Sequence, residues 1–388
     1  MTYRWMYIDF DSYFSSVEQQ LNPKLRNKPI AVVAVHTDAT CAIAASYEAK
    51  SFGVKTGTPI WEAKKMCPHL ICILANHEAY IEFHEKILRE IDRYVPVAKG
   101  CSIDEVACQL MENESAHAEK LAEKIKRGLK EHVGEWIRCS IGIAPNCYLA
   151  KVATDMQKPN GLVFIRKEDL PQKLYSLKLR DLPGIGANME TRLKKRGILD
   201  MKTLCSLDLE QLHKAWGSIE GARMWHHLKG IDLPDKKTQR RSVGHSHVMA
   251  PELRHPEKAR DVGRKLTAKA AERLRKMGLV ASRMNLSVIF EKGEYLELSL
   301  RCDRINDTLA FLSLFHEMWK IINPTGSARL KKISVRFSDL ENSVSQQYEF
   351  FTDHSREKEK KASHVLDLIH QKYGKDSISF GILPNYPK

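Results

Sequence analysis

Two acidic sites in the first third of the chain have the residue types for metal-dependent phosphoryl chemistry. Asp9 lies in the run Asp9-Phe10-Asp11 at the end of a predicted strand, and Asp104 and Glu105 lie between two strand-like segments. Two-metal phosphoryl transfer requires carboxylates from separate strands that converge on two cations roughly 4 Å apart. Magnesium prefers hard oxygen ligands and keeps several waters, so two or three carboxylates are sufficient. These acids predict a divalent-metal site, although acids at strand ends also serve commonly as turn residues.

The elements around these acids alternate between strands and helices. Apolar periodicity predicts a strand over residues 3–9, two strand-like pieces over 97–110, a helix over 116–133 and a strand over 138–144. Strands hold the residues at their ends rigidly, which a metal site requires. Residues 1–168 therefore predict an α/β or α+β unit. Further elements are expected as a helix up to residue 21, a strand over 29–35, a strand-to-helix segment over 42–52, and helices over 60–66, 78–94 and 145–155.

The second part of the chain has a different pattern. Residues 170–233 show only short helices, and the polar run 234–242 is typical of a linker. A second, small α+β domain is predicted beyond it. Its expected elements are a long basic helix over 257–276, strands over 284–291 and 295–301, a helix over 307–322, a strand over 330–337, and a last helix that ends near residue 373.

Positive charge is concentrated in this second part. The net charge is +14, of which about +1 belongs to residues 1–168 and about +13 to residues 169–388. A polyanionic partner, most simply a nucleic acid, would explain this asymmetry. A solvated basic surface would also explain it, so charge alone does not decide between the two.

The remaining composition is typical of a cytoplasmic protein. The nine cysteines are scattered without a Cys-x-x-Cys pair, which argues against a zinc ribbon and indicates reduced thiols. No apolar run approaches the roughly 18 residues that would span a bilayer. The N-terminus lacks the charged-then-apolar pattern of a signal peptide. We therefore expect a cytoplasmic location and no membrane partner.

Five motifs, in order along the chain, resemble those of the Y-family translesion DNA polymerases of the bacterial DinB/UmuC-like kind. Two of them are the acidic sites, in residues 9–14 and 102–105. Residues 45–55 are similar to the fingers motif of that family, residues 140–161 to its later palm motif, and residues 182–186 to the helix–hairpin–helix of its thumb. The resemblance covers roughly residues 3–340, and five co-linear motifs are not expected by chance.

The resemblance implies an α+β multidomain fold of the right-hand polymerase type. The catalytic palm would comprise residues 1–15 and 75–168, and the small fingers would comprise residues 16–74. The helical thumb would follow over 169–233, a linker over 234–243, a DNA-binding α+β little finger over 244–340, and a tail over 341–388.

The same resemblance implies the catalytic roles. Asp9, Asp104 and Glu105 would be the catalytic metal carboxylates, with Glu105 nearest the primer 3′-hydroxyl. The backbone carbonyl of Phe10 would be a further metal ligand. The expected cofactor is a pair of Mg²⁺ ions, with Mn²⁺ as a substitute. Asp11 is instead expected to cap the N-terminus of the helix that follows.

Six residues are implied in binding the incoming deoxynucleotide: Phe10, Tyr13, Phe14, Tyr47, Lys50 and Lys158. Phe14 would exclude a ribose 2′-hydroxyl by its volume, and Tyr13 would contribute by packing. Tyr47, Lys50 and Lys158 match positions that hold the triphosphate. The family more often has Arg at position 50 and a hydroxyl where this chain has Ala44. Because lysine lacks the bidentate guanidinium fork, we expect a weaker or differently oriented grip on the triphosphate.

Glycines and basic residues predict the DNA contacts. Gly184 and Gly186 would let backbone N–H groups face a phosphate, and Lys194 follows on the next helix. In the second domain the predicted contacts are Arg240, Arg241, Lys331 and Arg336, and basic residues recur on the helix over 257–276, Arg275 among them. Aromatic residues do not interleave with these positions, so we expect salt-sensitive binding to the backbone without sequence preference.

The tail contains a short segment that is similar to the peptides with which bacterial polymerases bind the sliding clamp. Gln347 would fix the register, and Phe350 and Phe351 would fill an apolar pocket. A final strand with alternating packing is the competing interpretation.

Together these features predict a monomeric, template-directed DNA polymerase. It would add deoxynucleotides to a primer 3′-end by two-metal phosphoryl transfer, with low fidelity and with bypass of damaged template bases. Its partners would be primer–template DNA, the incoming nucleotide and the sliding clamp. A non-catalytic DNA-binding accessory subunit and a nucleotide cyclase are the alternatives. The intact carboxylates argue against the first, and the basic second domain argues against the second.

Overall fold

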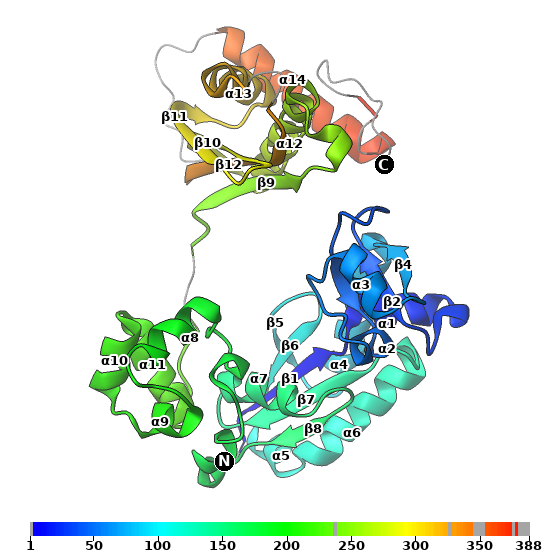
Figure 1. Ribbon diagram of the computed structural model, residues 1–388, viewed down its shortest axis with the longest axis vertical. Coiled ribbons are helices and arrows are strands. Elements are labelled where there is room, and N and C mark those ends of the chain that lie inside the picture. Colours follow the sequence, from blue (N-terminus) through cyan, green and yellow to red (C-terminus); the bar gives the residue numbers. More distant parts are fainter. Residues whose placement is uncertain (1–2, 236–238, 325–327, 344–353, 375–376, 379–388) are drawn as a thin grey trace. The chain divides into compact units, whose positions relative to one another are not determined.

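The chain divides into two compact units at the predicted linker. The computed structural model describes residues 3–235, 239–324, 328–343, 354–374 and 377–378, with only the backbone for 354–360 (Figure 1). The first unit is Met1–Asp235 and the second is Lys236–Lys388. Among the described helices, none is both long and apolar enough to cross a membrane.

A five-stranded sheet forms the centre of the first unit. Its order is β5 (Val97–Gly100), β6 (Glu105–Gln109), β1 (Trp5–Phe10), β7 (Cys139–Ala144) and β8 (Leu162–Phe164). Neighbouring strands are antiparallel except for the parallel β7–β8 pair. This mixed, mainly antiparallel sheet confirms the α+β class.

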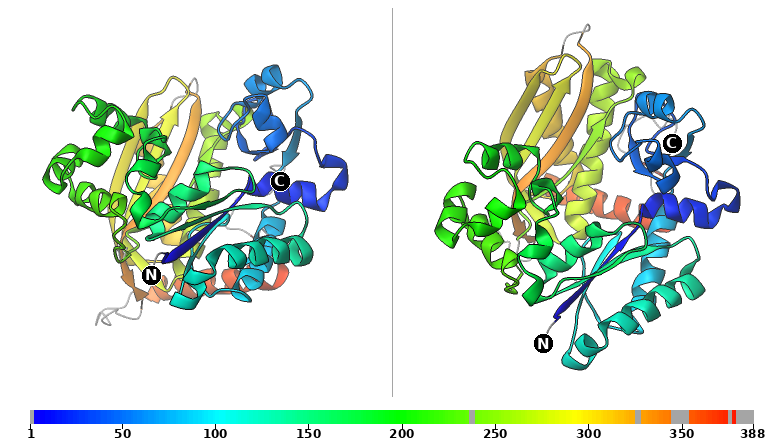
Figure 2. Two further views of the ribbon diagram at one scale, coloured as in Figure 1. Left: turned by 90° about the horizontal axis from the view of Figure 1, so that it is seen from below. Right: turned by 60° about the horizontal axis from the view of Figure 1, so that its bottom comes forward.

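Helices cover both faces of this sheet, as Figures 1 and 2 show. Met6 and Ile8 of β1 pack on one face with α4 (His77–Asp92) and α6 (Ala118–Gly128). Tyr7 belongs to the core on the other face, with α7 (Cys147–Met156). Successive side chains of a strand point to opposite faces, so Asp9 shares the α7 face with Tyr7.

Helix α7 lies very close to the sheet because Gly142 of β7 has no side chain. A Cβ at this position would collide with the backbone carbonyl of Ala150 and with the side chain of Ala153. The close approach brings the polar side chains of α7 within reach of Asp9.

The predicted fingers form a smaller sheet with its own apolar core. Helix α1 (Tyr13–Leu21) leads into it, and the strand order is β3 (Ala42–Ala45), β2 (Ile30–Val33) and β4 (Ile71–Leu74). Helices α2 (Tyr47–Ser51) and α3 (Ile60–Met66) complete it. The predicted strand-to-helix segment over 42–52 and the helix over 60–66 are confirmed.

The helix predicted over residues 116–133 is wrong in its extent. The structure has α5 (Glu112–Ala116), a break at His117, α6 (Ala118–Gly128), and then a π-helical turn over Leu129–Val133. The Glu114 side chain accepts a hydrogen bond from the backbone N–H of Met111, which starts α5 earlier than apolar periodicity indicates.

Four short helices form the predicted thumb. They are α8 (Ala187–Lys194), α9 (Met201–Ser206), α10 (Leu209–Trp216) and α11 (Ile219–Leu228). Asp200 and Asp208 cap α9 and α10 with their side chains. The buried amide of Asn146 joins these helices to the palm, because its Nδ2 donates to the carbonyls of His227 at 2.9 Å and Ile231 at 3.1 Å.

The second unit is a four-stranded antiparallel sheet with helices on one face. The order is β11 (Tyr295–Ile305), β10 (Leu279–Phe290), β12 (Leu330–Asn342) and β9 (Ser242–Val248). Helices α12 (Pro256–Lys276) and α13 (Thr308–Ile322) share one core with the apolar side of the sheet. Strand β9 begins at Ser242, inside the segment predicted as a linker.

Arg275 was predicted to lie on the DNA-binding face of the second unit, but it instead binds helix α14 (His354–Tyr373). Arg275 donates to both carboxylate oxygens of Asp367 on α14, at 2.7 and 2.8 Å, and to the carbonyl of Asn306. Its side chain is only 11% exposed. Arg275 therefore anchors α14 within the second unit.

Candidate active site

Asp9 and Glu105 lie side by side on adjacent strands. In the antiparallel β1–β6 pair Asp9 is the register partner of Glu105, and in the β1–β7 pair it is the partner of Ser140. The alternation of each strand places all three side chains on the face covered by α7. Two of the predicted catalytic carboxylates are thus brought together.

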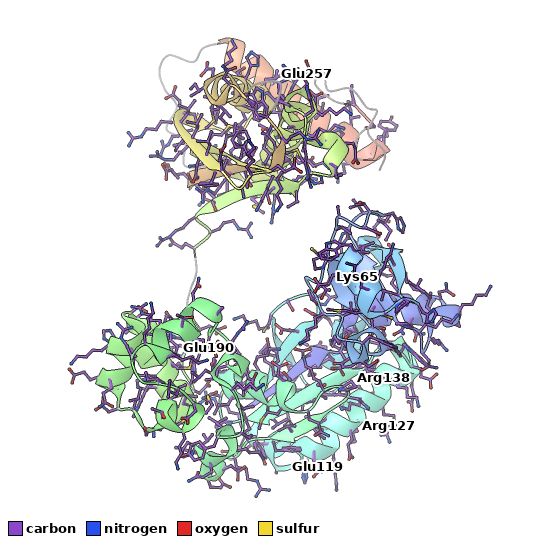
Figure 3. The ribbon with its side chains drawn as sticks, in the orientation of Figure 1. Lys65, Glu119, Arg127, Arg138, Glu190 and Glu257 are labelled. Carbon is purple, nitrogen blue, oxygen red and sulfur yellow. The ribbon has the colours of Figure 1, made fainter. Side chains whose placement is uncertain are left out.

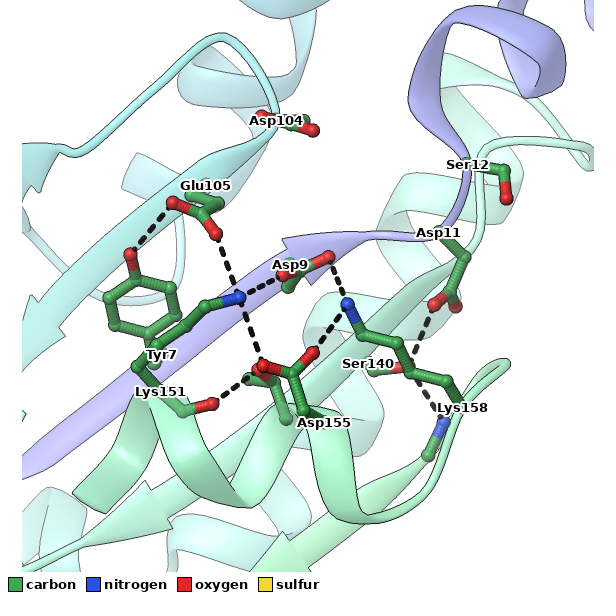
Figure 4. Close-up of polar contacts among 12 residues, drawn as sticks. Tyr7, Asp9, Asp11, Ser12, Asp104, Glu105, Ser140, Lys151, Asp155 and Lys158 are labelled. Atoms are coloured by element: carbon green, nitrogen blue, oxygen red, sulfur yellow. Dashed lines mark hydrogen bonds and ion pairs between the residues drawn. The ribbon is translucent and has the colours of Figure 1, made fainter. Parts of the chain in front are cut away.

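Two lysines, from α7 and the loop that follows it, bind this pair (Figure 4). The Lys151 ammonium contacts Asp9 Oδ2 and lies 2.7 Å from Glu105 Oε1. Lys158 contacts the other oxygen of Asp9 at 2.8 Å. Asp155 binds both lysines, at 3.4 Å from Lys151 and 2.9 Å from Lys158. We call these five side chains the lysine–carboxylate ring.

Electrostatics keep both lysines charged. Burial lowers the pKa of Lys151, but the charge of Asp9 and hydrogen bonds from the ammonium to Asp9 and Glu105 outweigh burial, so its pKa is raised. The pKa of Lys158 is raised by Asp9 and Asp155 against the same opposing effect of burial. The Asp9 side chain is only 9% exposed. A buried carboxylate needs such compensation.

The orientation of Glu105 is set from two sides. The Tyr7 hydroxyl donates to its Oε2 at 3.1 Å, while Oε1 faces Lys151. Burial raises the pKa of Tyr7, and the nearby Cys101 and Glu105 add to that rise. Tyr7 therefore stays protonated and remains a hydrogen-bond donor.

Asp104 stands apart from this pair (Figure 4). Its Oδ1 accepts a hydrogen bond from the Ser102 hydroxyl at 2.5 Å inside the β5–β6 turn. Within the described ranges, no three His, Cys, Asp or Glu side chains come together as a metal site. Of the predicted carboxylate trio, the structure brings two members together and leaves Asp104 at the edge, because the turn holds it one residue before β6 begins.

The prediction that Asp11 caps helix α1 is wrong. Ser12 precedes the helix, and no side chain caps it. The Asp11 side chain is buried and accepts hydrogen bonds from residues that are distant in sequence. Its Oδ1 accepts from the hydroxyls of Tyr47 at 3.2 Å and Ser140 at 2.9 Å, and its Oδ2 accepts from the N–H of Asn160 at 2.7 Å. Asp11 thus ties the end of β1 to the fingers, to β7 and to the loop that carries Lys158.

The predicted triphosphate residues gather beside the ring. Lys50 donates to the Ser12 hydroxyl at 2.6 Å and lies over the Tyr47 ring, 4.3 Å from its centroid. Burial lowers the pKa of Lys50, and the positive charge of Lys158 lowers it further. Two cations that repel each other across a half-buried space favour an anionic ligand between them.

The three aromatic residues of this region have different environments. The Phe10 and Tyr13 side chains are in the core, and the Tyr13 hydroxyl donates to the carbonyl of Tyr80 at 2.7 Å. Only the backbone of Phe10 can therefore serve a ligand, and Tyr13 acts by packing. Phe14 is half-buried, with its ring stacked on Tyr80 at a centroid distance of 4.3 Å.

The glycine hairpin lies next to the ring. Gly184 has φ of +91°, and a Cβ at Gly184 or Gly186 would meet no other atom, so this backbone is open. The turn lines a cavity of about 470 Å³ together with Lys151, Asp155 and Arg180. Lys194, the next predicted contact, pairs with Glu190 at 2.9 Å.

The four predicted DNA residues of the second unit occupy different sites. Arg336 lies on the sheet face opposite the helices, half-exposed, and pairs with Glu297 at 2.8 Å. Lys331 is a bulge residue, because Ile289 pairs with Lys332 and the next residue of β10 pairs with Leu330. Arg240 and Arg241 are exposed just before β9. The predicted clamp residues Gln347, Phe350 and Phe351 lie outside the described residues.

Sequence reasoning assigned no role to Tyr7, Lys126, Lys151 and Asp155. The signal for the last two was the spacing Lys151-x3-Asp155-x2-Lys158, which places an acid one helical turn after one lysine and three residues before another. Tyr7 could have been found because it lies two residues before Asp9 on the first strand, so that both side chains point to the same face of the sheet. Lys126 had no local signal, because its partners lie more than thirty residues away.

Comparison with known proteins agrees with this arrangement. Residues 8–155 match the impB/mucB/samB family, residues 240–350 its C-terminal domain, and residues 180–232 a DNA polymerase-iota thumb domain. The chain is 34% identical to DNA polymerase IV of Moorella thermoacetica over 325 residues, which is 80% of each chain. It belongs to the Y-family of DNA polymerases. It is also 29% identical to DNA polymerase IV 1 of Bacillus subtilis, over 97% of this chain and 92% of the relative.

Solved structures support the same assignment. A Y-family DNA polymerase chimera matches with a TM-score of 0.73 and 25% identity, over 87% of this polymerase and 99% of the chimera. An insertion ternary complex of Dbh DNA polymerase matches with a TM-score of 0.58 at 24% identity, which concerns the fold. The predicted fold, family and enzyme class, a low-fidelity translesion polymerase of the DNA polymerase IV kind, are therefore confirmed. Polymerases of this family typically use divalent metals.

Proposed function

We propose that this polymerase extends a primer 3′-end at the lysine–carboxylate ring, with deoxynucleoside triphosphates as substrates. The observation that carries the proposal is the pairing of Asp9 with Glu105 across β1 and β6, where one cationic group already bridges the two carboxylates. Lys50 and Lys158 lie beside this pair and suit a triphosphate.

The residues present fit a pair of divalent ions. Asp9, Asp104, Glu105 and the carbonyl of Phe10 are hard oxygen donors at adjacent strand ends, which is the donor set that Mg²⁺ and Mn²⁺ prefer. The bridging ammonium of Lys151 marks a place where positive charge is stable between Asp9 and Glu105. When bound, such ions lower the pKa of the attacking hydroxyl and neutralise the leaving pyrophosphate.

The protein side chains have their own roles in this proposal. Lys158 and Lys50 would turn from carboxylate and hydroxyl partners to phosphate oxygens, since all of these accept hydrogen bonds from an ammonium. Tyr7 would keep Glu105 oriented toward the primer terminus. Asp11 and Tyr47 would hold the fingers against the palm around the nucleotide.

DNA would bind by its backbone in both units. In the first unit the open Gly184–Gly186 turn offers N–H groups beside the ring. In the second unit the sheet face opposite the helices carries a row of serines, Ser287, Ser334 and Ser246 on neighbouring strands, with Arg336 beside them. Short side chains beside an arginine allow a duplex backbone to approach this row closely.

Replacement of Arg336 by Ala is expected to weaken primer–template binding and to reduce the slope of log Kd against log salt by about one unit. The reason is the loss of one phosphate contact. Fluorescence anisotropy across a salt series measures both quantities. Lys320→Ala on α13, on the helix-covered side, is the matched control and should leave the slope unchanged; equal slopes for the two variants would remove Arg336 from the DNA-binding surface.

Primer extension tests the proposed function. Purified protein should extend a labelled primer with Mg²⁺ on an intact template and past an abasic site. Failure on both templates with Mg²⁺ and with Mn²⁺, despite salt-sensitive DNA binding, would favour the accessory-subunit function. The sliding clamp as a partner, a monomeric state and a cytoplasmic location remain proposals.

A further inference from the structure

Lys126 on α6 has an unusual set of partners. Lys120 and Lys124 of the same helix are exposed, and so are Glu119 and Arg127, labelled in Figure 3, whereas Lys126 is half-buried. Its ammonium donates to the carbonyls of Asn160 at 2.7 Å and Gly161 at 2.8 Å, and to Asn160 Oδ1 at 3.1 Å. An ammonium has three protons, so all three are directed at one turn.

This turn has little freedom of its own. Asn160 has φ of 55°, in the left-handed region, and a Cβ at Gly161 would collide with the carbonyl oxygen of Gln157. The N–H of Asn160 donates to Asp11 at 2.7 Å, and that of Gly161 donates to Ser140 at 3.3 Å. Lys126 holds both carbonyls of the turn, and the N–H of Ile141 on β7 also donates to that of Gly161 at 2.9 Å, while the end of β1 and β7 hold its N–H side.

Lys158 enters the site from this same turn. It lies two residues before Asn160, and its ammonium contacts Asp9 and Asp155 at 2.8 and 2.9 Å. A lysine side chain is long and flexible, so the position of its ammonium depends on how firmly its backbone is held. Charge-assisted hydrogen bonds are roughly twice as strong as neutral ones, which suits Lys126 to this task.

We propose that Lys126 is a positioning residue that fixes the turn of Lys158 for contact with the triphosphate of the incoming nucleotide. The inference rests on the proposed function, because it assigns Lys158 to that substrate. In this proposal, a residue of α6 affects nucleotide binding although α6 packs on the face of the sheet opposite the active site. A residue that only anchors α6 to the fold would change stability without changing nucleotide affinity selectively.

Single-nucleotide incorporation separates these roles. For Lys126→Met we expect the KM for the deoxynucleotide to rise about tenfold while kcat changes less than about threefold, since uniform binding is lost. Lys126→Arg, which keeps charge and donors, should restore most of the affinity, and Lys124→Met should behave as the wild type. If Lys126→Met leaves the KM for the deoxynucleotide unchanged, whether or not kcat or the melting temperature falls, the proposal is overturned.

Amide hydrogen exchange gives a second readout that needs no polymerase activity. The amides of Asn160 and Gly161 should exchange at least about tenfold faster in Lys126→Met than in Lys124→Met, because local opening becomes easier. If amide exchange accelerates in Lys126→Met but the wild type extends no primer, the assignment of Lys158 to the nucleotide triphosphate is refuted together with the proposed function. If primers are extended and neither KM nor exchange changes, only the positioning role of Lys126 is refuted.

Discussion

Replacement of Asp104 by Asn is expected to lower the rate of nucleotide incorporation at least about 1,000-fold, which corresponds to roughly 4 kcal/mol of transition-state stabilisation. The change removes one negative charge from the proposed metal ligands and keeps the shape of the side chain. The asparagine oxygen can still accept the hydrogen bond of the Ser102 hydroxyl. Asp104 makes none of the ion pairs of the lysine–carboxylate ring, so those of Asp9 and Glu105 should survive.

Single-turnover incorporation with saturating DNA and nucleotide measures this loss directly. Asp155→Asn is the matched control, because it removes a neighbouring carboxylate, which binds Lys151 and Lys158 but is not a predicted metal ligand. We expect that control to stay within about tenfold of the wild type, because only lysine orientation is disturbed. If Asp104→Asn is active and Asp155→Asn is inactive, Asp155 and not Asp104 belongs to the proposed set of metal ligands.

The elements that periodicity predicts well are those whose buried face repeats over several turns. The helix over His77–Asp92 and the helix ending at Lys276 agree closely with the structure for that reason. Strands β4 and β8 have four and three residues, too few to show a period. Strand β9 went unrecognised because its run from Ser242 to Val248 is mainly polar and lacks a regular apolar alternation, and its pairing with β12 decides its structure.

The candidate site was predictable where function requires particular residue types. Asp9 and Glu105 could be identified as carboxylates that belong together, and the structure pairs them. Their cationic partners were not predictable, because Lys151 and Asp9 are 142 residues apart in sequence. Asp11 shows the same limit in reverse: its local sequence favours a helix cap, but its carboxylate accepts hydrogen bonds from Tyr47, Ser140 and Asn160, which lie far along the chain.

Replacement of Phe14 by Ala is expected to raise the use of ribonucleotides relative to deoxynucleotides about 100-fold, measured as the ratio of kcat/KM values, or roughly 2.7 kcal/mol of lost discrimination. A ring can exclude a 2′-hydroxyl only if it does not move aside. Phe14 is stacked on Tyr80 with an interplanar angle of 14° and meets His77 edge-on at 6.5 Å. These contacts support the ring from behind, and alanine would leave an open space in its place.

The alternative role of Phe14, simple packing, makes a different prediction. In that case Phe14→Ala would lower the melting temperature and slow the incorporation of both sugars equally, with an unchanged ratio. Tyr80→Phe is the control, because it keeps the stacked ring and removes only the hydrogen bond from its hydroxyl to Glu18. Its sugar discrimination should equal that of the wild type. If Phe14→Ala and Tyr80→Phe discriminate equally well, the volume of Phe14 does not select the sugar, and selection must come from contacts with the polar groups of the nucleotide.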